Sequence, residues 1–443
     1  MILQPMSLGW QNWARTERAT PLRVERPRAT EDVVAAVRRA TGEGLRVRAV
    51  GAGHSFTGAA VADGVRLELD ALAGVERVEP GPDGRTHVTV GAGIRLADLC
   101  VALAGLGLAL ENMGDIDRQS ISGAISTGTH GTGARLRGLA AQVVGVRLVT
   151  ADGSVRELGP RDELFELARL GLGAAGVLTA VTLAAVPAFR LEAREEPWPL
   201  DDVLDGLDEL AATNDHFEFY WFCHTRRALT KRNNRVADEV DRPLPRVRAW
   251  VADELLSNTA FELVNRAGAA APRAVPQLNR MSARGLGART FTADSHDVFV
   301  SPRRVRFREM EYAVPREQVR PVLDEIDRWT RAHHAAVPFP LEVRFAAADD
   351  LWLSTAYGRQ TAYVAVHQFW RMPHQEYFDA VEAIMASVSG RPHWGKLHSL
   401  GVARLTELYP RMADARRVRS AVDPEGVFAN PYVDRVFGPA GSS

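Results

Sequence analysis

The sequence predicts an α+β protein with two domains, and three observations lead to this fold class. At 443 residues, the chain is too long for one ordinary hydrophobic core. Predicted strands and helices alternate up to about Pro187, with no internal repeat of fixed period. A change in composition at residues 187–199 separates this part from a second part that contains aromatic strands.

The first domain begins with an amphipathic helix for which Thr30 is the predicted N-cap. Its valines and Ala40 fall on one helical face, and Gly42 and Gly44 end it. A later helix at 95–105 places Cys100 on its apolar face, where the thiol is core. The other elements expected here are strands at 45–50, 65–69, 87–90 and 179–186, a strand-like segment at 137–150 with a turn at 151–154, and a helix at 162–169.

The second part should hold a sheet and several helices. Its basic stretch at 226–248 is most simply a solvated face. The predicted elements are strands at 217–222, 341–345 and 363–369, a helix marked by Val322, Ile326 and Trp329, and a helical tail at 405–418 that ends in a turn at 423–426.

Composition narrows the range of partners. A formal net charge of -1 argues against a nucleic acid or an acidic membrane surface as the main partner. Two cysteines cannot form a disulfide framework, which suits a reducing compartment. Residues 1–20 lack the apolar core of a signal peptide, and the most apolar run, at 99–110, is far shorter than a membrane span. We therefore expect a cytoplasmic protein with no membrane span, and the sequence leaves its oligomeric state open.

A glycine-rich loop follows the strand at 45–50. It reads Val50-Gly51-Ala52-Gly53-His54-Ser55-Phe56-Thr57-Gly58. Glycine allows a positive φ and a close approach of the backbone to a ligand. Successive bare N–H groups can bind anionic oxygens such as those of a pyrophosphate. A lone loop of this kind is more often a tight turn with a surface histidine, so its meaning depends on a second run.

That second run lies at 115–133 and is rich in serine, threonine and glycine. Its hydroxyl and N–H groups are suited to pyrophosphate and ribityl oxygens. Such a composition is also found in flexible linkers. Here Ile116, Ile121 and Ile125 recur as apolar anchors, which favours an ordered loop. The Gly-Lys-Ser/Thr ending of a Walker loop is absent.

Charged residues near the C-terminal end form a third group. Glu342 and Arg344 lie two apart on a predicted strand and therefore share one face. Such a pair is most often a surface salt bridge, and Lys396 after its Trp-Gly turn could be simply exposed. In a pocket, however, a guanidinium can hold a substrate oxygen while a carboxylate orients a hydroxyl. The histidines at 333, 334, 367 and 374 show no metal-ligand spacing, so no metal site is predicted.

Four features together resemble the vanillyl-alcohol-oxidase-type FAD flavoproteins, in their aldonolactone and alditol oxidase branch. They are the loop around His54, the run at 115–133, Glu342-Val343-Arg344 and His393-Trp394-Gly395-Lys396, in family order along most of the chain. The resemblance implies a two-domain VAO/PCMH-type FAD-binding fold whose cap domain is built on an antiparallel sheet. It assigns residues 1–187 to the FAD-binding domain, 188–404 to the cap (substrate) domain and 405–443 to a segment that returns to the FAD-binding domain.

The resemblance also implies that a ring nitrogen of His54 carries FAD covalently, on the flavin 8-methyl group. Non-covalent FAD is the alternative. Relatives with two covalent bonds use a cysteine near the second run, and residues 115–133 contain none, so one bond is expected. The segment at 171–178 should lie along the adenosine end, or be a tight turn. The predicted FAD-binding residues are Val50, Gly51, Ala52, Gly53, His54, Ser55, Gly58, Gly114, Asp115, Ser120, Gly123, Ala124, Thr127, Gly128, Thr129, His130, Gly131, Gly176 and Val177.

The same resemblance implies the chemistry. Glu342 and Arg344 would lie over the flavin N5 side and act on the substrate carbinol. Lys396 would lie near the N1–N5 edge, where a cation stabilises anionic reduced flavin. The implied reaction is hydride transfer from the carbinol carbon to N5, followed by reoxidation by dioxygen to give hydrogen peroxide.

Departures from the family pattern narrow the range of expected substrates. By alignment, Asp115 replaces a serine of the alditol oxidases that contacts substrate, and His367 replaces a threonine. Both changes favour sugar lactones, such as L-gulono- or D-arabinono-1,4-lactone, over open polyols. Asp115, His367, Glu342, Arg344 and Lys396 are the predicted substrate contacts. A small Gly114 facing the flavin C4a region leaves room for dioxygen and favours an oxidase.

Three alternatives stay open. They are an alditol (xylitol or sorbitol) oxidase, a lactone dehydrogenase that uses a cytochrome or a quinone, and a catalytically silent flavin-binding protein. The complete Glu342, Arg344 and Lys396 set argues against the last.

Overall fold

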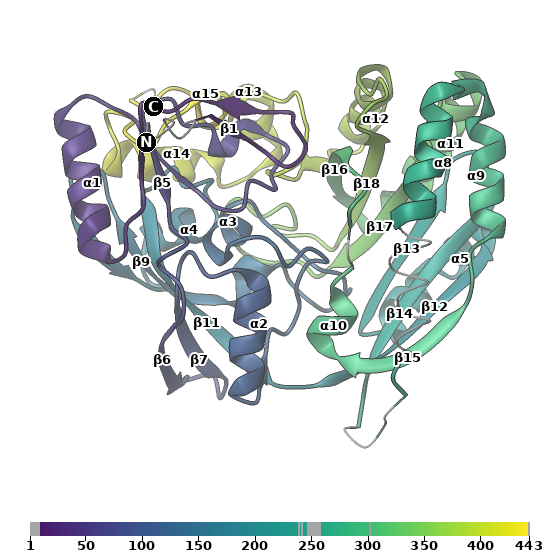
Figure 1. The fold of residues 1–443 in the computed structure, drawn as a ribbon, viewed down its shortest axis with the longest axis horizontal. Helices are drawn as coiled ribbons and strands as arrows, with labels where there is room; N and C mark the ends of the chain where they lie inside the picture. The colour runs from purple at the N-terminus through teal and green to yellow at the C-terminus, as the bar shows by residue number, and fades with distance from the viewer. Residues whose placement is uncertain (1–8, 238–239, 241, 246–257, 302, 442–443) are drawn as a thin grey trace, which may run out of the picture.

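The computed structural model describes residues 9–237, 240, 242–245, 258–301 and 303–441. Three predictions reach beyond these residues: at 1–8 of the N-terminal stretch, at 238–239, 241 and 246–248 of the basic stretch, and at 442–443 of the C-terminal segment. The chain forms two halves that lie side by side, with both termini in the same half (Figure 1). Each half contains sheets and helices, so the predicted α+β class is confirmed.

The first half is built on two sheets. Three parallel strands are ordered β3-β5-β4, and a larger sheet has the order β10-β9-β11-β7-β6 with β8 paired to β11. The strands are β1 (Trp10–Gln11), β2 (Arg18–Ala19), β3 (Arg23–Glu25), β4 (Val47–Val50), β5 (Val65–Glu68), β6 (Val75–Pro80), β7 (Thr86–Gly91), β8 (Leu108–Ala109), β9 (Val143–Val149), β10 (Val155–Leu158) and β11 (Val177–Pro187). The helices are α1 (Thr30–Gly42), α2 (Leu96–Gly105), α3 (Ile121–Ser126) and α4 (Glu163–Arg169), with short 3₁₀ turns η1 (Gly58–Ala60) and η2 (Leu139–Gln142).

The C-terminal helices pack on this first half, as the yellow ribbon in Figure 1 shows. They are α13 (Val402–Leu408), α14 (Met412–Val422) and α15 (Pro431–Phe437). Val433 and Phe437 of α15 belong to the same hydrophobic core as Val47 and Leu67 of the parallel strands. The Asn430 side chain caps α15 and also donates to the Gly58 and Val61 carbonyl oxygens, each at 2.9 Å. The predicted boundaries at 187/188 and 404/405 stay predictions.

The second half is one eight-stranded antiparallel sheet with helices against it (Figure 1). Its order is β15-β12-β14-β13-β17-β18-β16-β19. The strands are β12 (Arg190–Pro199), β13 (His216–Phe222), β14 (Arg227–Val236), β15 (Arg289–Asp294), β16 (Phe307–Pro315), β17 (Pro340–Ala346), β18 (Thr361–Phe369) and β19 (Arg391–Pro392). The helices are α5 (Leu200–Asp205), α6 (Leu207–Thr213), α8 (Phe261–Ala270), α9 (Val275–Arg284), α10 (Ser295–Phe299), α11 (Val319–Ala332) and α12 (Gln375–Ser387), with 3₁₀ turns η4 (Pro272–Ala274) and η5 (Arg316–Gln318).

Alternation along the central strands gives this sheet one apolar and one polar face. Leu341, Val343 and Phe345 of β17 point to a core that also contains residues of α5, α6, α11 and α12. Glu342 and Arg344, between them, point to the opposite face, yet they are buried. That polar face is covered by loops of the first half: the Gly133 N–H donates to the Phe345 carbonyl oxygen at 2.8 Å.

Four local predictions were wrong, and two of them concern the N-terminal part of the chain. Ala29, not Thr30, is the N-cap of α1; the Asp32 carboxylate accepts from the Arg28 and Ala29 N–H groups at 2.8 and 3.1 Å. The segment at 137–150 begins as the turn η2, because the Leu139 N–H donates to the Thr129 carbonyl oxygen.

The tail at 405–418 is two helices, since Pro410 disfavours helical backbone at the residue before it. Within the basic stretch, Lys231 and Arg232 are not solvated: they pair with Glu218 and Glu196 and are only 15% and 17% exposed.

Candidate active site

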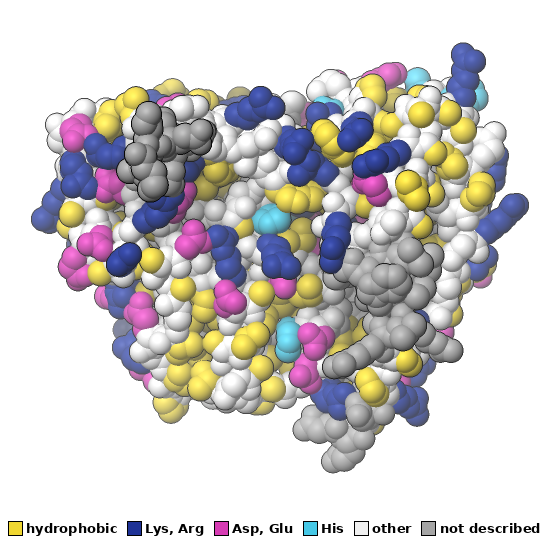
Figure 2. Space-filling view, in the orientation of Figure 1, with side chains coloured by type: hydrophobic (Ala, Val, Ile, Leu, Met, Phe, Trp, Pro, Cys, Tyr) yellow, Lys and Arg dark blue, Asp and Glu magenta, His cyan; other side chains and the backbone are white. Residues whose placement is uncertain are grey.

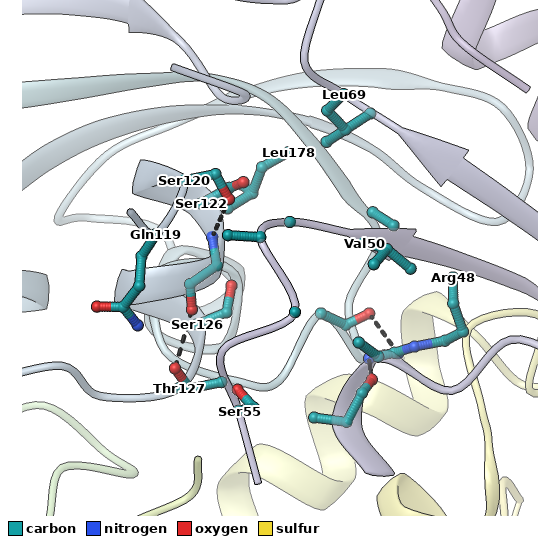
Figure 3. A pocket seen from close by; sticks show the side chains of 18 of the residues that line it. Arg48, Val50, Ser55, Leu69, Gln119, Ser120, Ser122, Ser126, Thr127 and Leu178 are labelled. Atoms are coloured by element: carbon teal, nitrogen blue, oxygen red, sulfur yellow. Dashed lines mark hydrogen bonds between the residues drawn. The ribbon is translucent and has the colours of Figure 1, made fainter. Parts of the chain in front are cut away.

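A cleft lined mainly by backbone and small side chains crosses the first half of the molecule (Figure 3). Three loops form it, and they lie far apart in sequence. The lining includes Arg48, Ala49, Val50, Gly51, Ala52, Gly53, His54, Ser55, Gln119, Ser120, Ser122, Gly123, Ser126, Thr127, Leu172, Gly173, Gly176, Val177, Leu178 and Phe428. Nine predicted cofactor residues of the two glycine-rich runs face this one cleft: Val50, Gly51, Ala52, Gly53, His54, Ser55, Ser120, Gly123 and Thr127. Eight others do not line it: Gly58, Gly114, Asp115, Ala124, Gly128, Thr129, His130 and Gly131.

Two glycines show why the cleft needs small residues. A Cβ at Gly51 would lie 2.4 Å from the Ser120 Oγ atom, so the two runs touch there. Gly176 has a φ of +150°, and a Cβ there would lie 2.4 Å from the Val149 carbonyl oxygen. Bare backbone and the hydroxyls of Ser120, Ser122 and Thr127 are the groups that phosphate and ribityl oxygens bind, so the cleft fits FAD.

Arg48 ties two of these loops to the C-terminal segment beside the cleft (Figure 3). Its guanidinium donates to the carbonyl oxygens of Ala59, Leu172 and Phe428 at 2.5, 2.6 and 2.7 Å. Burial lowers the pKa of Arg48 to about 10, which still leaves it charged at neutral pH. The C-terminal segment around Phe428 therefore closes the cleft.

His54 stands where this cleft meets a second cavity, because it lines both. The Trp13 ring stacks on its imidazole with centroids 6.0 Å apart. Burial, helped by Arg95 and Lys396, lowers the pKa of His54 to about 4. The imidazole is therefore neutral at neutral pH and keeps a nitrogen lone pair available for bond formation.

The second cavity, of about 500 Å³, lies between the polar face of the cap sheet and the loops of the first half. This is within the usual size range of small-molecule sites. Its lining includes His54, Ser55, Phe56, Gly114, Asp115, Gln119, Thr127, Thr129, His130, Arg303, Phe307, Glu309, Glu311, Glu342, Arg344, His393, Gly395 and Lys396. Figure 2 shows basic side chains and a histidine gathered in the middle of one face, where the two halves meet.

Glu342 and Arg344 belong to a buried charge network on one side of this cavity. Arg344 contacts Glu342 directly, and its guanidinium lies 2.9 Å from Glu218 and 3.3 Å from Asp115. Arg303 contacts Asp115 directly and lies 3.2 Å from Glu342. The Glu342–Arg344 pair is therefore not the surface salt bridge that was the simpler alternative.

Electrostatics fixes the charge of this network. Burial would raise the pKa of Asp115, but the Arg303 and Arg344 guanidinium groups outweigh it and hold that pKa well below its usual range. Burial would likewise lower the pKa of Arg344, and Glu342, Asp115 and Glu218 raise it instead. At neutral pH, Asp115 and Arg344 are therefore both charged, and each depends on the other.

Lys396 lies on the other side of the cavity. The Phe56 N–H donates to the Gly395 carbonyl oxygen at 2.7 Å, and the Thr57 hydroxyl donates to the Trp394 carbonyl oxygen at 3.1 Å. These bonds hold the Lys396 segment against the His54 loop. The ammonium lies 5.1 Å from the centroid of the Phe56 ring and pairs with the buried Glu309.

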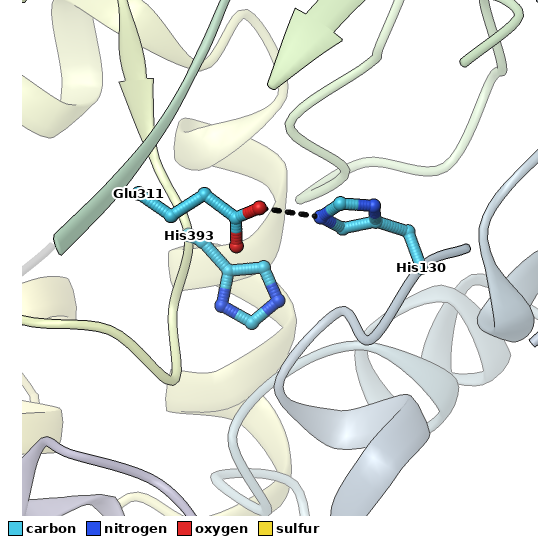
Figure 4. A group of neighbouring side chains, drawn as sticks. All are labelled: His130, Glu311 and His393. Atoms are coloured by element: carbon cyan, nitrogen blue, oxygen red, sulfur yellow. Dashed lines mark ion pairs between the residues drawn. The ribbon is translucent and has the colours of Figure 1, made fainter. Parts of the chain in front are cut away.

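His130, Glu311 and His393 form a third buried group, with ligand atoms within 4.8 Å of one another (Figure 4). Residue spacing along the chain did not indicate this cluster. The His130 Nε2 atom lies 3.2 Å from Glu311, and its Nδ1 atom faces the Gly131 carbonyl oxygen at 2.9 Å. The His393 Nδ1 atom accepts from the Gly395 N–H at 3.1 Å, and its Nε2 atom faces the Gly128 carbonyl oxygen at 3.1 Å. Since protein groups already face these nitrogens, the cluster is better described as an internal polar network than as a metal centre.

Two further predicted residues, His367 and Gly114, are placed in ways that bear on their expected roles. His367 does not line the cavity: its Nε2 atom lies 3.5 Å from Glu309 Oε1, and the ring faces a neighbouring apolar cavity under α8 and α9. Its direct contact with substrate stays a prediction. Gly114 does line the cavity, but a Cβ there would lie 3.1 Å from Thr129 Cγ2 and 3.2 Å from the His130 carbonyl oxygen. Packing alone therefore favours glycine at this position.

Several residues of the site had not been predicted: Arg48, Glu218, Tyr220, Arg303, Glu309 and Glu311. For four of them the sequence does hold a signal. In Phe217-Glu218-Phe219-Tyr220-Trp221 and in Phe307-Arg308-Glu309-Met310-Glu311-Tyr312, polar residues recur at every second position within apolar strands. Carboxylates on the inner strands of a sheet that is covered on both faces indicate a site.

Comparison with known proteins agrees with this geometry. The family model described as D-arabinono-1,4-lactone oxidase matches residues 181–436, more than half of the chain. The chain belongs to the D-arabinono-1,4-lactone oxidase family. A second model, an FAD binding domain, matches residues 21–159, which include both glycine-rich runs. The predicted resemblance and the FAD cofactor are thus confirmed, and this member of the lactone oxidase family is an FAD-dependent oxidoreductase acting on CH–OH donors.

Full-length relatives differ in the activity they are named for. L-gulono-1,4-lactone dehydrogenase of Mycobacterium tuberculosis is 43% identical over 98% of this chain and 100% of its own length. L-gulonolactone oxidase of Bos taurus is 33% identical over 97% of this chain and 98% of its own. Alditol oxidase of a Streptomyces species is 32% identical over 97% of this chain and 99% of its own.

The fold of this lactone oxidase family member also matches solved structures. Cholesterol oxidase from B. sterolicum superposes with a TM-score of 0.81 at 18% identity, covering 98% of this chain and 97% of that one. At this identity the likeness concerns the fold alone, and it confirms the predicted FAD-binding fold with an antiparallel cap sheet. Among the described residues, no helix combines the length and the apolar character needed to cross a bilayer.

Proposed function

We propose that this protein oxidises a sugar-derived 1,4-lactone, of the L-gulono- or D-arabinono-1,4-lactone class, at a carbinol carbon and passes the electrons to dioxygen. The observation that carries the proposal is the charged cavity beside His54, where Arg344, Glu342 and Lys396 line one space. A polyhydroxylated lactone offers hydroxyl and carbonyl oxygens to both signs of charge.

The residues of the cavity would act by holding and orienting the substrate. Arg344 would bind a substrate oxygen and stabilise negative charge on it, while Glu342 accepts from the hydroxyl to be oxidised. Arg303 and Tyr220 hold Glu342 in place, at 3.2 and 2.9 Å from its two carboxylate oxygens. Asp115 would contact a further hydroxyl. Lys396 would supply positive charge where negative charge develops on the cofactor side.

FAD held in the cleft would supply the two-electron acceptor for the substrate hydride. In the balanced reaction, the carbinol loses a hydride from carbon and a proton from oxygen and becomes a carbonyl. Dioxygen then takes up two electrons and two protons and becomes hydrogen peroxide. A lactone dehydrogenase is the second candidate, supported by the name of the relative that is 43% identical.

A substrate and acceptor screen tests this proposal. Purified protein is offered L-gulono-, L-galactono- and D-arabinono-1,4-lactone, xylitol and sorbitol, and oxygen uptake is compared with cytochrome c and quinone reduction. We expect a lactone to give the highest kcat/KM, with peroxide formed in equal amount to the oxygen consumed. Faster turnover of xylitol than of any lactone would contradict the substrate class. Turnover with cytochrome c or quinone but no oxygen uptake would contradict the oxidase.

We also propose that FAD is attached covalently to His54. A neutral imidazole at the junction of cleft and cavity supports this. The yellow colour should stay with acid-precipitated wild-type protein and be lost from His54→Ala. His296→Ala is the matched control, because that histidine lines neither cavity, and it should keep the colour. Acid-stable flavin in His54→Ala would place the bond elsewhere.

A further inference from the structure

Glu309 is a buried carboxylate shared by two basic side chains. It lies on β16, with its side chain only 6% exposed. One carboxylate oxygen, Oε2, contacts the Lys396 ammonium, and the other, Oε1, lies 3.5 Å from the His367 Nε2 atom. The neighbouring Leu397 N–H also donates to the Glu309 backbone carbonyl oxygen at 2.9 Å. Strand β16 thus holds the Lys396 segment through backbone and side chain together.

The tautomer of His367 follows from its other nitrogen. The Nδ1 atom lies 2.9 Å from the Pro340 carbonyl oxygen. A carbonyl oxygen can only accept, so Nδ1 carries the proton. In neutral His367, Nε2 therefore presents a bare lone pair to the Glu309 carboxylate, and this buried nitrogen makes no hydrogen bond. Nε2 gains a favourable contact with Glu309 only when it takes up a proton.

His367 and Lys396 therefore flank the two oxygens of one carboxylate. The rings of Phe307 and Phe339 pack on His367 at 5.1 and 6.1 Å between centroids and exclude water from this contact. The charged and titratable groups that act on Glu309 are Lys396, His367 and Glu311. Burial would raise the pKa of Glu309, but the Lys396 ammonium outweighs it and lowers that pKa to about 2.

We propose that Glu309 and His367 are positioning residues that set where the Lys396 ammonium stands and how much of its charge the active site feels. Glu309 anchors the ammonium at the cavity wall and partly neutralises it. The bare Nε2 lone pair of His367 repels the nearer carboxylate oxygen and so turns the carboxylate toward Lys396. This inference rests on the proposed role of Lys396, and it gives His367 an indirect role in place of direct contact with substrate.

The test compares Glu309→Gln, Glu309→Asp and Lys396→Met with the double variant Glu309→Gln/Lys396→Met, all as FAD-loaded protein. The readouts are the rate of flavin reduction by the best lactone, its pH profile, and the midpoint potential of the bound flavin. We expect Glu309→Gln to slow reduction at least about tenfold and to move the alkaline limb of the profile to lower pH, because a partly buried ammonium that has lost its carboxylate partner gives up its proton more readily. Glu309→Asp should restore part of the rate.

Comparison of the double variant with the single variants shows whether Glu309 acts on flavin reduction through Lys396. If Glu309 acts through Lys396, the double variant reduces its flavin no more slowly than Lys396→Met alone. Losses that multiply would overturn the proposal, as would a Glu309→Gln variant whose pH profile and flavin potential equal those of wild type. If Lys396→Met itself leaves flavin reduction unchanged, the proposed function of Lys396 fails instead, which is a distinguishable result.

Two further variants separate positioning from simple structural loss. Glu382→Gln removes another buried carboxylate of the cap, which binds Tyr312 and Ser399 away from both cavities, and it should leave the flavin potential unchanged. His367→Gln should change the rate of flavin reduction and the flavin potential with KM within about twofold of wild type. A large rise in KM with an unchanged flavin potential would overturn the indirect role and indicate direct contact with substrate.

Discussion

The cofactor cleft and the substrate cavity meet at His54 but are built in different ways. The cleft is lined by backbone and small side chains of short contiguous runs, and its shape depends on close approach, as at Gly51 and Ser120. The cavity is lined by charged side chains that alternate strands bring to one face of a sheet, as Glu342 and Glu309 show. Because of this difference, shape should control binding of FAD, whereas paired charge should control catalysis.

Among substitutions in these two regions, removal of Arg344 should slow catalysis the most. In Arg344→Ala, Glu218 keeps Lys231, and Glu342 keeps Arg303 and Tyr220, but the network loses its central cation. Breaking a buried ion pair costs about 3–5 kcal/mol, and loss of one electrostatic contact to a reacting oxygen costs about 10²–10³-fold in rate. We expect flavin reduction, measured by stopped flow, to fall at least about 10³-fold with FAD still bound.

Glu342→Gln should lose nearly as much, and the double variant should be little worse than the worse single one, because the two act as a unit. Arg320→Ala, which removes an exposed cation of the same half, is the control. Near-normal reduction in Arg344→Ala would mean that the cavity does not hold the substrate.

Lys396→Met should come next. Methionine keeps most of the side-chain volume but removes the charge, which matters most as negative charge develops. We expect flavin reduction to slow about 10²-fold with KM changed by less than about threefold. A change confined to KM would instead give Lys396 a role in substrate binding.

In the cleft, side-chain volume should control FAD binding, whereas charge should have little effect on it. Gly176→Ala places a Cβ against the Val149 carbonyl oxygen at a φ of +150°, which costs about 1–3 kcal/mol. FAD content per polypeptide, measured by absorbance, should fall several-fold, while the fraction that retains FAD should be reduced at the wild-type rate. Gly42→Ala, whose Cβ would meet open space, is the control. Full FAD content in Gly176→Ala would contradict the importance of cleft shape.

The smallest effect expected on activity at neutral pH concerns His398, a buried histidine that lines neither the cleft nor the cavity. Its Nε2 atom lies 2.9 Å from the Tyr432 hydroxyl, and burial lowers its pKa from 6.5 to about 3. The unfolded chain therefore takes up the proton first as pH falls. This contribution to stability is complete above pH 6.5 and is lost as pH falls toward 3, by about 1.4 kcal/mol per pH unit. Denaturant unfolding of His398→Gln between pH 4 and 6 should show a slope of stability against pH smaller by that amount, and an unchanged slope would contradict the assignment.

The sequence by itself determined the features that are local. Glycine-rich runs can be recognised because the residues that shape one loop are neighbours in the chain, and both runs do line one cleft. Most strands and helices were also predictable, because the period of apolar residues reports which face is buried, as in α2 with Leu96, Leu99 and Leu103. The same alternation predicts that Glu342 and Arg344 share one face of β17, and both side chains do line the cavity.

Only the tertiary structure decided which charges meet. Asp115 and Arg303 come from loops of different halves, and Arg344 finds Glu218 only because β13 pairs with β17. The bond from Phe56 to Gly395 places Lys396 beside the His54 loop across more than three hundred residues. Such contacts depend on strand order and loop packing, which leave no periodic trace in the sequence. A carboxylate in a strand therefore looks the same in the sequence whether it faces water or the cation that keeps it charged inside the protein.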